Sequence, residues 1–143
     1  MSEQENLKAA NAFFEAWNAG DLRTSLVYLA DDFKGEAPGS PAPMTGEQNL
    51  AYNQNFMTAF PGTKFKILLT VMQGDYVVIN WMITGKNNGP LQSPSGAVIP
   101  PTGKMVTTTG STTSQLRNNK IVYSWTFFDM AGLLGQLGLM PPM

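Results

Sequence analysis

Acid–base chemistry in this chain must come from carboxylates, tyrosines, lysines, amides or hydroxyls, because the sequence contains no histidine and no cysteine. Their absence excludes Ser-His-Asp and Cys-His catalytic systems and metal sites built on histidine ligands. The chain has ten carboxylate side chains, and five of them are aspartates. Each aspartate can therefore be assessed individually as a general acid or base.

Asp129 is the aspartate whose context best fits a general acid or base. It lies in apolar sequence at the end of the last expected strand. Burial there would raise the pKa of its carboxyl group and suit it to proton transfer near neutral pH. The alternative is that Asp129 caps the helix that follows it. The other aspartates lie at an expected helix start, after the expected second helix and in a hairpin turn: Asp21, Asp31, Asp32 and Asp75.

Neutral polar side chains on the expected strands could bind the oxygen of a substrate. Asn80 stands in mid-strand between Val78 and Met82, and Thr84 shares its face. This face meets either a pocket or the solvated outside of the sheet, and in a pocket either residue could hydrogen-bond a substrate carbonyl. A later strand has a similar polar face, which could line a pocket or form a hydrated dimer interface: Thr107, Thr109, Ser111 and Thr113.

Length and charge narrow the classes of function. The 143 residues match one domain spanning 1–143. The net charge is −1 and the nine lysines and arginines are scattered, so we expect no nucleic-acid partner. No apolar stretch approaches the roughly 20 residues of a membrane span. Residues 1–6 are polar and acidic, unlike a signal peptide, which makes the cytoplasm the expected location.

The first half of the chain has the patterns of helices. A helix is predicted over residues 3–18, with apolar side chains at spacings of three and four. Asp21 can cap a short second helix that carries leucines at 22, 26 and 29. The prolines and glycines of residues 31–44 predict a loop with little room for a strand. A third helix is predicted over residues 46–59.

The second half of the chain has the alternation of strands. Strands are predicted over residues 64–73, 76–86, 104–117 and 120–127, with a loop at 87–103 and a final short helix over 129–137. Helices followed by hairpin-connected strands indicate an α+β fold, in which a curved antiparallel sheet packs on the helices.

Five segments resemble the SnoaL-like polyketide cyclases, a branch of the nuclear-transport-factor-2-like cone fold. They follow the family's order along the chain: FFEAWNAGDL (13–22), AFPGTKFKI (59–67), GDYVVINWMITGKNNG (74–89), IPPTGKMV (99–106) and NKIVYSWTFFDMAGLLGQLG (119–138). The resemblance implies a cone-shaped α+β barrel with a mostly apolar pocket at its open end. It also implies a homodimer formed through the outer face of the sheet.

The resemblance implies an activity as well. Characterised members close a ring by an intramolecular aldol reaction without metal or organic cofactor, using an acidic side chain in the pocket. By the same resemblance Trp17 would face the pocket and Asn53 would orient the substrate, while core packing and an exposed helix position are the respective alternatives. The family's Asp stands one residue after the position of Trp125, where this chain has Thr126, and the His of many relatives is replaced by Ser124.

Two hypotheses of different classes follow. The leading one is a cofactor-independent cyclase or isomerase for a small apolar carbonyl compound, with Asp129 as acid/base and with Asn80 and Thr126 as polar positioners. The alternative is a non-catalytic small-molecule binding or accessory protein on the same fold. A third possibility, a module that only mediates interactions, would have a filled cone without a pocket.

Overall fold

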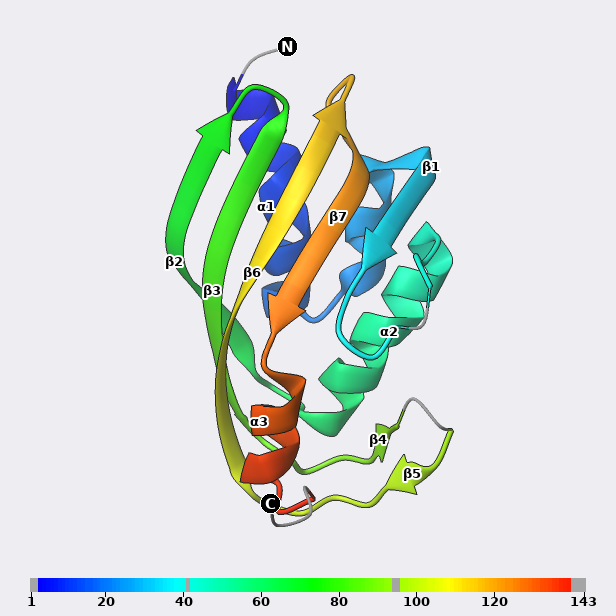
Figure 1. Ribbon diagram of the computed structural model, residues 1–143, viewed down its shortest axis with the longest axis vertical. Coiled ribbons are helices and arrows are strands. Elements are labelled where there is room, and N and C mark those ends of the chain that lie inside the picture. The colour runs from blue at the N-terminus through cyan, green and yellow to red at the C-terminus, as the bar shows by residue number, and fades with distance from the viewer. Residues whose placement is uncertain (1–2, 41, 94–95, 140–143) are drawn as a thin grey trace.

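A long curved sheet with helices on its concave face makes up the computed structural model, which describes residues 3–40, 42–93 and 96–139 (Figure 1). The helical elements are α1 (Glu3–Ala19), the 3-10 helix η1 (Leu22–Tyr28), α2 (Gly46–Ala59) and α3 (Met130–Gln136). The long strands are β1 (Leu29–Glu36), β2 (Lys64–Gln73), β3 (Tyr76–Lys86), β6 (Met105–Arg117) and β7 (Lys120–Phe128). Two short strands, β4 (Leu91–Gln92) and β5 (Val98–Ile99), pair with each other.

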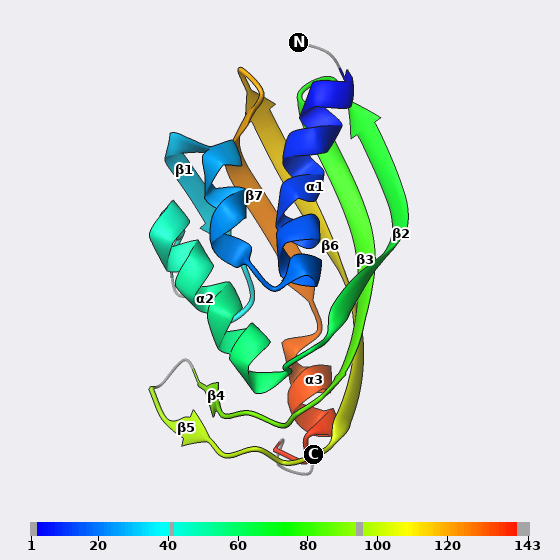
Figure 2. The same ribbon diagram turned by 180° about the vertical axis from the view of Figure 1, so that it is seen from behind.

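The main sheet has the strand order β1-β7-β6-β3-β2. The pairs β2–β3, β3–β6 and β6–β7 are antiparallel, while β1 joins the edge in parallel with β7. Seen from behind, α1, η1 and α2 cover the concave face, and α3 continues from the end of β7 (Figure 2). The protein therefore has the mixed α+β architecture and the curved sheet that the order of its elements predicts.

The core lies between α1 and the sheet, because every second side chain of β3 points toward that helix. Val77, Ile79 and Trp81 of β3 are buried on the concave face, where they meet Ala10 and Phe14 of α1. Burial of a side chain of this size contributes roughly 1.5–3 kcal/mol. The helix spacing of α1 and the period of two in β3 thus supply matching apolar surfaces, as the sequence predicts.

The prediction of a loop over residues 31–44 is wrong in its first part, where the structure has β1. The prolines of this segment all come after residue 37, so the backbone N–H groups of β1 remain able to pair. Phe33 is buried in the core on this strand. The parallel partner of β1 is β7, about ninety residues further along the chain, and local patterns do not reveal so distant a pairing.

Two smaller differences concern η1 and the 87–103 segment. The short second helix is a 3-10 helix that ends at Tyr28, and the Asp21 side chain makes no capping hydrogen bond to it. The segment expected as a loop contains β4 and β5. In the described part of the chain, no helix is long and apolar enough to cross a membrane.

Candidate functional site

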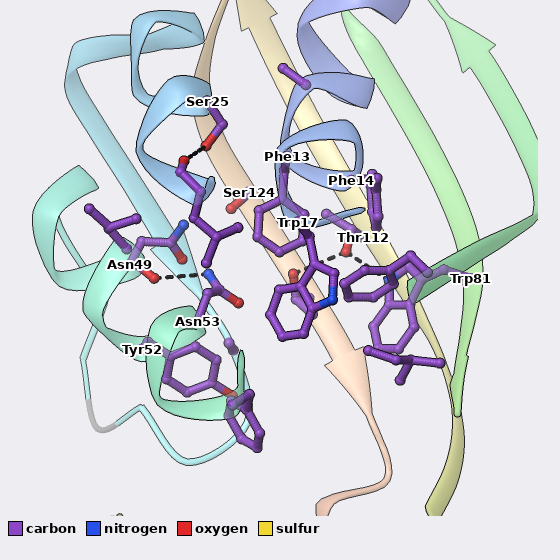
Figure 3. Close-up of a pocket in the computed structure, with 18 of the residues that line it drawn as sticks. Phe13, Phe14, Trp17, Ser25, Asn49, Tyr52, Asn53, Trp81, Thr112 and Ser124 are labelled. Atoms are coloured by element: carbon purple, nitrogen blue, oxygen red, sulfur yellow. Dashed lines mark hydrogen bonds between the residues drawn. The ribbon is translucent and has the colours of Figure 1, made fainter. Parts of the chain in front are cut away.

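A cavity lies between the concave face of the sheet and the helices. Its volume is about 140 Å³, and side chains from α1, η1, α2, α3 and the long strands line it. Figure 3 shows aromatic rings from α1, α2 and β3 turned toward this space. The concave side of the sheet therefore carries a candidate pocket.

Six aromatic residues that line the cavity form a continuous belt, in which each ring contacts the next. The ring centroids are 5.2 Å apart for Tyr52–Phe56, 6.0 Å for Phe56–Phe128, 6.1 Å for Phe128–Trp81, 5.0 Å for Trp81–Phe65 and 5.1 Å for Phe65–Trp17. Most of these contacts are edge-on, which leaves ring faces available to pack on other groups. This aromatic belt suits an apolar, ring-containing guest.

The polar groups of the cavity are all uncharged. None of the described lining residues is Asp, Glu, Lys or Arg. The polar lining residues are Ser25, Asn49, Tyr52, Asn53, Thr63, Thr108, Thr112, Ser114, Ser124 and Thr126. An ionised guest would lose its hydration without gaining a counter-charge, so this lining favours a neutral one.

The α2 wall carries two amides and a phenol. Asn53 Nδ2 donates to the backbone oxygen of Asn49 over 2.8 Å, and both side chains point toward the cavity in Figure 3. The Tyr52 hydroxyl donates to the Pro38 carbonyl over 2.6 Å. Burial raises the pKa of Tyr52 above its usual value, so the phenol stays protonated and holds α2 to the segment after β1.

The sheet floor carries a line of hydroxyls next to an indole. Trp81 Nε1 donates to Thr112 Oγ1 over 3.1 Å, and Thr112 Oγ1 lies 3.2 Å from Thr126 Oγ1 on the neighbouring strand. Trp17 Nε1 instead donates to the backbone oxygen of Thr63 over 3.1 Å. Both tryptophans of the aromatic belt are therefore held by a hydrogen bond as well as by packing.

Three of the proposed substrate-binding residues line the cavity, namely Trp17, Asn53 and Thr126. Asn80 and Thr84 do not. Strand alternation places them opposite to the buried Trp81, on the outer face of β3, where Thr84 Oγ1 lies 3.0 Å from Thr107 Oγ1. We therefore no longer assign Asn80 and Thr84 to substrate binding.

Asp129 also lies outside the lining. Its exposed carboxylate accepts the backbone N–H of Gly132 over 2.7 Å and caps α3, which is the capping alternative considered from the sequence. Within the described residues, no group of three or more acidic side chains could hold a metal ion.

Three cavity residues were not predicted from sequence as site residues, namely Asn49, Tyr52 and Thr112. Strand alternation could have indicated Thr112, because this residue lies on the face of β6 opposite to Thr109 and Ser111. Asn49 lies one helical turn before Asn53 and so shares its side of α2. Tyr52 lies three residues after Asn49 and so also shares this side of α2, but its bond to Pro38 depends on the fold of the 37–40 segment.

The match to a family model settles the relationship of this chain to known proteins. The model is described as SnoaL-like polyketide cyclase and matches residues 8–137. The chain belongs to the SnoaL-like polyketide cyclase family. No curated protein sequence matches this SnoaL-like chain.

Solved structures agree with this family in fold. A candidate SnoaL-like polyketide cyclase from Jannaschia sp. CCS1 is 21% identical, with a TM-score of 0.84 over 99% of this chain and 98% of that one. IdmH from Streptomyces antibioticus, a candidate polyketide cyclase, is 27% identical, with a TM-score of 0.77 over 93% and 98%. A protein of ketosteroid isomerase-like fold from Catenulispora acidiphila is 18% identical, with a TM-score of 0.73 over 94% and 98%. This SnoaL-like chain thus has the cone fold expected from its sequence.

Proposed function

We propose that this SnoaL-like protein binds a small, neutral, largely apolar carbonyl compound in the cone cavity and acts on it, without a cofactor, as a cyclase or isomerase. The observation that carries the proposal is the aromatic belt, which lines a cavity whose described polar side chains are all uncharged. Family membership supplies the reaction class.

The lining supports catalysis by positioning more than by proton transfer. An aromatic belt can hold a flexible chain in a folded, reactive conformation, which lowers the entropic part of the barrier to ring closure. Neutral donors near a carbonyl oxygen stabilise the negative charge that develops there. We assign no proton transfer to Asp129, because its carboxylate is exposed and bonded to Gly132.

A second candidate is a non-catalytic binding or accessory protein. The specific observation that favours it is the lack of Asp, Glu, Lys and Arg among the described lining residues. An aldol closure needs a base to form the enolate, and this cavity leaves that role to solvent or to the compound itself.

A conversion assay separates the two candidates. The purified protein is incubated with neutral linear triketone and tetraketone esters, and products are followed by liquid chromatography and mass spectrometry. Ring closure faster than in buffer, and slowed at least about threefold by Asn53→Ala, supports the cyclase. The matched control is Asn55→Ala, which should leave the rate unchanged because Asn55 lies on the same helix as Asn53 but outside the described cavity lining.

The remaining outcomes also decide between the candidates. Esters that bind and are recovered unchanged after long incubation support the non-catalytic protein. Esters that neither bind nor react contradict both candidates.

We further propose that residues 1–143 act as one domain that forms a homodimer through the outer sheet face. Two rows of paired side chains cross this face from β2 to β7, and all eight residues are uncharged: Leu69, Asn80, Ser111 and Phe127, then Val71, Val78, Thr113 and Trp125. Leu69, Val71 and Phe127 are 53%, 49% and 66% exposed. An apolar face of this kind is typical of a protein interface.

Light scattering coupled to size-exclusion chromatography tests the dimer. Phe127→Asp should convert it to monomer, because a charge would be buried in the interface. Val27→Asp is the matched control, since Val27 is equally exposed at 66% but lies on η1. A monomeric wild-type protein at micromolar concentration would contradict the proposal.

A further inference from the structure

The hydrogen-bond chain on the cavity floor runs through three side chains from three adjacent strands. Trp81 of β3 contacts Thr112 of β6, and Thr112 contacts Thr126 of β7. All three residues line the cavity, and Figure 3 shows Thr112 beside the Trp81 ring. The chain therefore begins in the aromatic belt and ends at a hydroxyl near the position of Ser124.

The hydrogen-bond chain contains one O–H donor that its own two bonds do not use. The indole N–H can only donate, whereas each hydroxyl has one proton and two lone pairs. The three groups bring three protons, and the two bonds between them use two. The described residues make no other side-chain hydrogen bond with Thr112 or Thr126. One O–H is therefore free to donate into the cavity.

The direction of the chain assigns that free proton to Thr126. Because Trp81 must donate, Thr112 is its acceptor. Between Thr112 Oγ1 and Thr126 Oγ1, which lie 3.2 Å apart, either hydroxyl can be the donor, and the bond accepted from the indole makes Thr112 the stronger donor of the two. Thr126 then accepts within the chain and donates outward. Donation through successive groups polarises the last O–H and strengthens it as a donor.

Packing keeps the first member of the chain in place. Trp81 is 4% exposed, and its ring lies against Gly110, where a Cβ atom would overlap it. The rings of Phe65 and Phe128 also contact the indole, with centroids 5.0 Å and 6.1 Å away. The indole therefore cannot turn away to release Thr112, and the donor at Thr126 is set before a ligand arrives.

We propose that Thr126 is the specificity-determining donor of the cavity and binds a carbonyl oxygen of the ligand. The site would then select ring compounds that carry a carbonyl over compounds of the same shape without one. This inference rests on the proposed binding function and names the group that the site recognises. Thr126 is a binding residue in it, while Trp81 and Thr112 are positioning residues.

A matched pair of probes tests the donor. 9-Fluorenone and fluorene share a flat three-ring frame and differ in the carbonyl group. Their dissociation constants are measured for the wild-type protein, Thr126→Val, Thr126→Ser and Thr112→Val. Thr108→Val is the control, because Thr108 also lines the cavity from β6 but lies outside the hydrogen-bond chain.

The expected result follows from the net value of one hydrogen bond. The wild-type protein should prefer fluorenone by about five- to tenfold. Thr126→Val should abolish this preference with fluorene binding unchanged, Thr126→Ser and Thr108→Val should retain it, and Thr112→Val should reduce it. The infrared carbonyl stretch of bound fluorenone should lie at lower frequency in the wild-type protein than in Thr126→Val, a difference that loss of packing alone would not produce.

Two other results would overturn the inference in different ways. Equal binding of the two probes, or a preference that survives Thr126→Val, removes the donor role and leaves the proposed binding function intact. Failure of both probes to bind the folded wild-type protein contradicts the binding function and this inference with it.

Discussion

Trp81 lies directly over the backbone of Gly110, its register partner on β6. A side chain at position 110 would overlap the indole ring, and its Cβ atom would also stand 2.8 Å from the Phe127 carbonyl oxygen. The glycine therefore makes room for the ring to lie against the strand, where its Nε1 reaches Thr112. One missing side chain on a neighbouring strand thus shapes the floor of the cavity.

Gly110→Ala should lower the free energy of unfolding by about 2 kcal/mol, because the added methyl group forces the ring out of its packed position. Urea denaturation followed by circular dichroism measures the change. Gly135→Ala in α3 is the control, since its Cβ atom would meet nothing within 4 Å, and a helical glycine replaced by alanine should give a small stabilisation. Equal effects of the two substitutions would contradict this account of Trp81.

Asn87→Ala should be the costlier of two asparagine substitutions that affect the 87–103 segment. Asn87 is fully buried; its Nδ2 donates to the Ala59 and Gly89 carbonyls, and its Oδ1 accepts from the N–H and hydroxyl of Thr102. Removal leaves buried groups unpaired and should cost about 3 kcal/mol in urea denaturation.

Asn55→Ala is the counterpart of that substitution. Asn55 makes two similar bonds to the backbone of Gln92, but it is only half-buried and Gln92 is exposed, so water can replace the lost partner. We expect a cost of about 0.5 kcal/mol. A cost for Asn87→Ala as small as this would show that the 87–103 segment is held by other contacts.

Asp129→Asn should leave probe binding and ester conversion within about twofold of wild type, because an asparagine side chain also caps a helix and position 129 lies outside the lining. Asp129→Ala should lower the free energy of unfolding by about 1 kcal/mol. Parallel measurements of stability and conversion check both effects. Loss of conversion in Asp129→Asn at unchanged stability would restore the acid/base role considered from the sequence.

The buried phenol of Tyr52 should make stability depend on pH in the alkaline range. Burial raises its folded pKa above the ordinary value of 10.0, so its contribution is complete below about pH 10 and is lost as the pH rises further. Tyr52→Phe loses the bond to Pro38, which should cost about 1 kcal/mol near pH 8. Above pH 10 the titration of Tyr52 should lower the free energy of unfolding of the wild-type protein by up to about 1.4 kcal/mol per pH unit. The Tyr52→Phe protein lacks this group and should show no such fall.

Urea titrations of both proteins from pH 8 to pH 11 measure that difference. We expect the gap in unfolding free energy to close near pH 11. Parallel curves across the whole range would show that Tyr52 titrates alike in the folded and unfolded chain.

Local patterns predicted the elements that depend on near neighbours. The turn at Asn118 and Asn119 is one example, because both residues adopt positive φ values of 53° and 65°, as a tight hairpin turn requires. The apolar face of β3 is another, since alternation alone groups Val77, Ile79 and Trp81. β1 escaped prediction because its partner β7 is distant in the sequence.

The sequence by itself determined the family, the order of helices and strands, and the lack of histidine and cysteine chemistry. Only the tertiary structure decided which side of each strand faces the cavity, and it turned Thr112 and Thr126 inward while Asn80 and Thr84 face outward. It also placed the Asp129 carboxylate on the Gly132 N–H. The physical reason is that alternation separates two faces without identifying either, and a face becomes the inside only when helices from another part of the chain pack against it.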